Sequence, residues 1–181
     1  MQFPTIFGLP AHPLIVHATV VIVPLAAVAV LLHAFWPRAR ARLGLVTPLA
    51  ALTAVVLVPL STSSGEQLEG TVGDSRLVQQ HASLAEGLLP WTIGLLVVAT
   101  LLWLRDRRDA GRRTPGVAPE RGPWPTLLAP LVIGVLAVVA FLGTTQQVIR
   151  IGHSGAKAAW QNVAAHEHPG GRDRDADGDG R

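Results

Sequence analysis

The chain contains no cysteine and a single methionine, Met1, among its 181 residues. The absence of cysteine excludes disulfides, thiolate nucleophiles, iron–sulfur clusters and cysteine–zinc sites. A metal or cofactor therefore has to be held by histidine, carboxylate or other oxygen ligands. Charged residues are also scarce, at 15% of the chain, while hydrophobic residues reach 49% and the mean hydropathy is +0.39. This composition indicates an integral membrane protein.

Charge is absent from four long apolar segments, which cover residues 14–36, 43–60, 87–104 and 124–148. Each is long enough, at about 1.5 Å of rise per residue, to cross roughly 30 Å of hydrocarbon as a helix. A soluble amphipathic helix would carry a charged stripe on one face, and these segments carry none. The sequence therefore predicts an all-α fold, a polytopic integral membrane four-helix bundle, whose third helix spans about 84–104.

The expected domain organisation follows from these segments. Residues 1–11 form an outer N-terminal arm, residues 12–165 form the transmembrane domain, and residues 166–181 form a polar tail that we expect to be disordered. The polar cluster 61–64 comes directly after the second apolar segment, and we expect the second helix to end there in the lipid headgroups. This cluster carries no catalytic motif, so hydrolysis is not expected.

Arginine is concentrated in two connections between apolar segments, residues 37–43 and 105–123. The stretch 61–80 after the second segment has a single arginine, Arg76, beside the three carboxylates Glu66, Glu69 and Asp74. The positive-inside rule therefore places both arginine-rich loops in the cytoplasm and both termini outside a bacterial cytoplasmic membrane. The pI of about 10.9 comes from these arginines beside the membrane, so we expect contacts with membrane lipids and not with nucleic acid.

Four of the seven histidines fall at the outer end of the predicted helices. His12 and His17 open the first helix, His81 precedes the third apolar segment, and His153 follows the fourth. His33 lies sixteen residues beyond His17, which places it about 24 Å further along the same helix. It is therefore not part of this group of four. Because polar side chains inside membranes tend to be functional, the group of four is the candidate site.

Helical spacing separates the first two histidines. His12 and His17 are five residues apart, which turns them about 140° from each other around a helix. Pro13 suits the first helical position, so His12 is expected to cap the helix. His17 is then the better candidate for a ligand that faces the bundle interior. The alternative for His17 is an interfacial histidine bonded to a backbone carbonyl.

Small and acidic residues accompany the other two histidines. Gly152 and Gly155 flank His153 and leave room for a large flat group, or they loosen the helix as it leaves the membrane. Glu86 follows His81 by five residues. Its carboxylate is placed to act as a second-shell acceptor or a proton-carrying group, or else to pair with Arg150.

Two motifs carry a family resemblance. The stretches AHPLIVH at 11–17 and RIGHSG at 150–155, with His81 and with Gly65 followed by Glu66, resemble a bacterial family catalogued as domain of unknown function 2231. The resemblance covers residues 9–160 and implies a four-helix membrane module, sometimes found beside redox partners such as Rieske-type domains. The family has no settled activity, and the resemblance raises the expectation of redox chemistry.

The favoured hypothesis is an electron-transfer module that binds haem b in the outer half of the bundle. Histidines on facing helices are the usual way for a bundle to hold a cofactor, and bis-histidine ligation is the haem option that remains without cysteine. The preferred axial ligands are His81 and His153, with His17 as the competing choice. Arg76 is one of three cations that would neutralise the propionates. The candidate cofactor-binding residues are His12, His17, His81, His153, Arg150 and Lys157.

Such a module would be a redox subunit more than a stand-alone enzyme, and it would exchange electrons with an extracytoplasmic redox protein or with quinol. Two alternatives stay open. One is a non-haem transition metal held by His17, His81, His153 and Glu86, with Glu66 as a further ligand. The other is a structural or partner-binding bundle without a cofactor. The sequence gives no oligomeric state.

Overall fold

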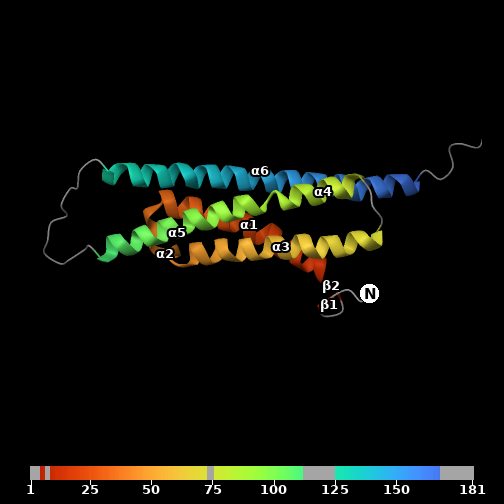
Figure 1. The fold of residues 1–181 in the computed structure, drawn as a ribbon, viewed down its shortest axis with the longest axis horizontal. Helices are drawn as coiled ribbons and strands as arrows, with labels where there is room; N and C mark the ends of the chain where they lie inside the picture. Colours follow the sequence, from red (N-terminus) through yellow and green to blue (C-terminus); the bar gives the residue numbers. More distant parts are fainter. Residues whose placement is uncertain (1–4, 7–8, 73–75, 112–124, 168–181) are drawn as a thin grey trace, which may run out of the picture.

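The computed structural model describes residues 5–6, 9–72, 76–111 and 125–167, and within them the chain is built almost entirely from helices (Figure 1). A short antiparallel ribbon comes first, with Thr5 opposite Pro10 and Ile6 opposite Leu9. The elements in chain order are β1 (Thr5–Ile6), β2 (Leu9–Pro10), α1 (Ala11–Phe35), α2 (Pro37–Leu43), α3 (Val46–Val72), α4 (Arg76–Glu86), α5 (Leu89–Gly111) and α6 (Pro125–Glu167).

The long helices pack as two hairpins in one bundle. The first hairpin is α1 with α3, and the second is α4 and α5 with α6 (Figure 1). Helix α1 also packs against α6, and α3 packs against α5, so the four long helices close into a ring. Four helical stretches are long and apolar enough to cross a membrane, namely His12–Phe35, Val46–Gln67, Arg76–Gly111 and Leu128–Ala158. The predicted four-helix membrane bundle is confirmed.

The centre of the bundle is made largely of small side chains. Ala27, Ala51, Ala99 and Ala137 are fully buried, one from each long helix. Small residues let helix backbones approach closely, which favours packing between helices in a membrane where water does not drive them together. Leucine, valine and isoleucine side chains are exposed along the outer surfaces of the bundle, as expected for a surface that faces lipid acyl chains.

Helical structure continues beyond the charge-free segments. Helix α3 continues through the polar cluster 61–64 to Val72, so the expectation that the second helix ends at this cluster is wrong. The hydroxyls of Thr62, Ser63 and Ser64 bond to carbonyls three residues earlier, which lets polar side chains stay inside a helix. Helix α4 precedes α5, and α6 runs on to Glu167. The bundle therefore extends beyond its apolar part at one end.

We call this end the histidine end; it contains the start of α1, the later parts of α3 and α6, and α4. The other end, which we call the arginine end, contains α2 and the last turns of α5. The loop expected at 37–43 is the short helix α2, with Pro37 at its start. The loop expected at 105–123 is helical as far as Gly111, and its remainder, like the tail from 168 onward, lies outside the described residues.

Close packing at Gly143 provides a test of the bundle. The ring of Trp91 on α5 lies directly over the buried Gly143 of α6, so that a Cβ at this position would overlap the ring. Gly143→Ala is expected to lower the free energy of unfolding by about 1–3 kcal/mol, because the crowded helices have to move apart. Gly94→Ala is the matched control, since nothing lies within 4 Å of a Cβ there. Equal losses in the two variants, measured by unfolding in mixed micelles, would contradict this packing.

Candidate functional site

A cavity of about 540 Å³ opens at the histidine end, between α1, α3, α4 and α6. Its volume lies in the range of roughly 300–1,000 Å³ that is usual for small-molecule and cofactor sites. Most of its lining is apolar, with His12, His81, Glu66 and Glu86 among the polar groups. The apolar side chains are mainly Val16, Val20, Val58, Leu88, Val148 and Ile151. The cavity therefore suits a ligand with an apolar body and a few polar or metal contacts.

His12 enters the cavity from α1 and is held by α3. Its Nδ1 lies 2.8 Å from Oγ of Ser64, and that hydroxyl donates to the carbonyl oxygen of Ser61 at 2.9 Å. The ring also lies close to Gly65, where a Cβ would be 3.2 Å from Cε1 of the imidazole. Contacts on two sides therefore fix the position of this ring.

His81 is held in the same way by a different pair of helices. Its Nδ1 lies 3.0 Å from Oγ of Ser154 on α6, and the serine hydroxyl donates to the carbonyl oxygen of Ile151 at 2.8 Å. A Cβ on Gly155 would lie 3.0 Å from Cε1 of the ring. The small residue expected to leave room for a porphyrin therefore makes room for His81. Gly152 also lines the cavity, and nothing lies within 4 Å of a Cβ there.

The other two histidines of the predicted group lie elsewhere. His17 is exposed, and its Nδ1 bonds to the carbonyl oxygen of Pro13 at 2.6 Å, which matches the alternative given for it. His153 is also exposed and does not line this cavity. The expected orientation of the first helix is therefore reversed, because His12 and not His17 faces the interior. The rotation of α1 against α3, and not the helical start, decides which histidine turns inward.

The charged residues of the predicted site differ in their relation to the cavity. Glu86 lines it from the last turn of α4. Arg76, Arg150 and Lys157 are exposed on the two helices that carry His81 and Ser154. Within the described residues, no three histidine or carboxylate side chains are grouped closely enough to hold a metal ion. The set suggested for a non-haem metal, His17, His81, His153 and Glu86, is therefore not assembled.

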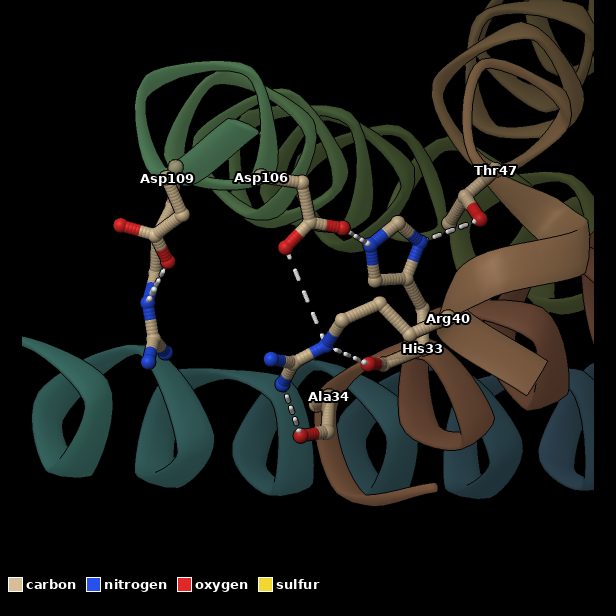
Figure 2. A network of polar contacts seen from close by, with 7 residues as sticks. His33, Ala34, Arg40, Thr47, Asp106 and Asp109 are labelled. Carbon is tan, nitrogen blue, oxygen red and sulfur yellow. Dashed lines mark hydrogen bonds and ion pairs between the residues drawn. The ribbon is translucent and has the colours of Figure 1, made fainter. Parts of the chain in front are cut away.

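A second polar network lies at the arginine end, and the sequence analysis did not find it (Figure 2). His33 on α1 is fully buried. Its Nδ1 lies 2.8 Å from Oγ1 of Thr47 on α3, and its Nε2 lies 2.9 Å from Oδ2 of Asp106 on α5. Arg40 of α2 donates to the carbonyl oxygens of His33 and Ala34 and lies 3.8 Å from Oδ1 of Asp106. This network joins four helices, and both ring nitrogens of His33 are already bonded.

Comparison with known protein families gives a match over most of the chain. A family model described as predicted membrane protein (DUF2231) matches residues 8–166. No curated protein matches the chain, and no solved structure matches it. The matched segment includes both hairpins and every histidine of the predicted group.

Proposed function

The chain belongs to the DUF2231 family of predicted membrane proteins, and we propose that it is an electron-transfer module that binds haem b with His12 and His81 as the axial ligands. The observation that carries the proposal is the pair of imidazoles that line one apolar cavity from separate hairpins. Nδ1 of each ring lies within hydrogen-bonding distance of a serine hydroxyl, so the proposal assigns Nε2 to the ligand. Bundles commonly hold a haem or a metal between histidines on facing helices.

The chemistry of the cavity wall supports a porphyrin. A porphyrin has a broad apolar face, and the valine, leucine and isoleucine side chains of the lining match such a face. Its two propionates carry negative charge, and Arg76, Arg150 and Lys157 are exposed cations on α4 and α6. Charge-assisted hydrogen bonds between these cations and carboxylates are stronger than neutral ones. The cations do not line the cavity itself, whose charged lining residues are Glu66 and Glu86, so the proposal has the propionates extend from the cavity toward α4 and α6.

The position of the cavity limits the path of the electrons. It lies at the histidine end, whereas the buried histidine at the arginine end, His33, already has both nitrogens bonded. A single haem at one end does not carry electrons across the bilayer. We therefore propose exchange with an extracytoplasmic redox protein or with quinol at the histidine end. The arginine-rich end would face the cytoplasm according to the positive-inside rule.

The experiment that tests the proposal is a reduced-minus-oxidised absorption spectrum of the purified protein after expression with added haem precursor. We expect sharp α and Soret bands of low-spin haem, together with about one iron atom per chain by elemental analysis. A colourless protein that contains stoichiometric zinc, copper or nickel would replace the haem proposal with the non-haem metal site. A colourless protein without metal would contradict both and support a bundle without a cofactor.

A further inference from the structure

We propose that the cavity is built from two copies of one half-site, in which Ser64 and Ser154 are positioning residues that hold His12 and His81 in the same tautomer. The identity of the ligand between the imidazoles rests on the proposed function, but the state of the imidazoles does not. The inference adds two residues that bind no ligand themselves and act through the histidines.

The two halves correspond in their histidine, serine and glycine contacts. In the first hairpin, a histidine near the start of α1 bonds to the serine of a Ser-Gly pair on α3. In the second hairpin, a histidine on α4 bonds to the serine of a Ser-Gly pair on α6. The glycine that follows the serine, Gly65 or Gly155, packs against the same imidazole in each half. The serine thus fixes the ring nitrogen, and the glycine fixes the distance between the ring and the helix.

The number of protons on each serine hydroxyl assigns the tautomer of His12 and His81. A serine hydroxyl has one proton, and the hydroxyls of Ser64 and Ser154 give theirs to backbone carbonyls. Each hydroxyl can then only accept a hydrogen bond from the histidine that contacts it. Nδ1 of His12 and of His81 must therefore carry the proton, and a neutral imidazole has its lone pair on the other nitrogen, Nε2. Both histidines thus offer the same nitrogen to a ligand.

His33 provides an internal contrast within the same protein. Its Nε2 faces Oδ2 of Asp106, and an ionised carboxylate can only accept a hydrogen bond. Nε2 of His33 therefore carries a proton, whereas the proposal gives the two cavity histidines a proton on Nδ1 and none on Nε2. A measurement that distinguishes the two tautomers can therefore be applied to His12, His81 and His33 in the same sample.

The consequence concerns the class of ligand. Two neutral Nε2 lone pairs suit a metal centre that takes two imidazole ligands, such as the iron of a haem. Hydrogen bonds to the second nitrogen of a ligating histidine fix its tautomer and orientation, and their loss typically lowers metal affinity by about 10- to 100-fold. Because the two half-sites are alike, we expect the losses caused by Ser64→Ala and Ser154→Ala to be similar in size.

The experiment is nitrogen NMR of the cofactor-free protein with ¹⁵N-labelled histidine, recorded at a pH where the imidazoles are neutral. We expect His12 and His81 to carry the proton on Nδ1, and His33 to carry it on Nε2. Ser64→Ala should release the tautomer of His12 alone, and Ser154→Ala that of His81 alone. Ser63→Ala is the matched control, because that exposed hydroxyl bonds to the carbonyl oxygen of Leu60 and to neither histidine.

Two results would overturn the positioning role. One is a proton on Nε2 of His12 and His81 in the unaltered protein, and the other is an unchanged tautomer in both serine variants. Haemin titrations of the same samples separate this inference from the proposed function. Fixed tautomers in a protein that takes up no haemin would support the positioning serines and contradict haem binding. Fixed tautomers, together with a haemin affinity that falls in Ser64→Ala and in Ser154→Ala, would support the positioning serines and haem binding alike.

Discussion

The haem-loaded protein is expected to lose its low-spin spectrum when either His12 or His81 is replaced by alanine. Each imidazole supplies one side of the proposed iron site, and removing one leaves the iron with a single histidine ligand. The expected result is loss of the sharp α band and conversion of the remaining haem to a high-spin form. The reduced-minus-oxidised spectra of the two variants, at equal protein concentration, are the measurement.

The chain supplies its own controls for this prediction. His17 and His153 are exposed histidines near the same end of the bundle and do not line the cavity. His17→Ala and His153→Ala are therefore expected to keep the spectrum of the unaltered protein. If the bands vanish in the His153 variant and persist in the His12 variant, the original pairing of His81 with His153 is correct and the one proposed from the cavity is wrong.

The second large effect is expected at the arginine end, where Asp106→Ala should lower the free energy of unfolding by about 1–3 kcal/mol. The carboxylate accepts a hydrogen bond from Nε2 of His33, whose side chain is fully buried. Its loss leaves that nitrogen without its partner, and an unsatisfied buried polar group costs about this much. The variant also removes the ion-pair partner of Arg40. Reversible unfolding in mixed micelles measures the change.

Asp109→Ala is the matched control for this effect. Asp109 lies one turn further along α5, is exposed, and pairs with Arg105 across 3.7 Å (Figure 2). Exposed pairs of this kind contribute about 0.3–0.5 kcal/mol. Similar losses in the two variants would show that the buried network does not hold the arginine end together.

The sequence predicts the fold well because membrane-spanning helices are set by local composition. An apolar stretch without charge has to satisfy its backbone hydrogen bonds internally, so a helix follows from the sequence of each segment alone. The four spans and the all-α fold were predicted on this basis and are confirmed. The positive-inside assignment of the arginine-rich loops stays a prediction.

The candidate site was predicted less completely, because its contacts join distant parts of the chain. Ser64 and Ser154 contact histidines 52 and 73 residues away, and a polar cluster after an apolar segment predicts only a helix end. The choice between His12 and His17 depends on how α1 rotates against its neighbours, which the spacing of the two residues does not encode. His81, which the sequence analysis proposed as an axial ligand, lines the cavity, and its role as a ligand stays a prediction.

The network at the arginine end was missed for a related reason. Asp106 lies in a segment whose arginines dominate its composition, and it is 73 residues from His33. A histidine within an apolar helix signals that a partner is needed, but the sequence does not tell which carboxylate supplies it. The position of His33 inside the first apolar segment is the sequence signal for such a network.

The most direct test of the central claim, that His12 and His81 form one haem site, is a titration of haemin into the cofactor-free protein in lipid nanodiscs. We predict saturation at one haemin per chain with the spectrum of a six-coordinate low-spin haem, and no such saturation in the His12→Ala, His81→Ala double variant. Binding that does not saturate, or the same low-spin spectrum in the double variant, would contradict the claim.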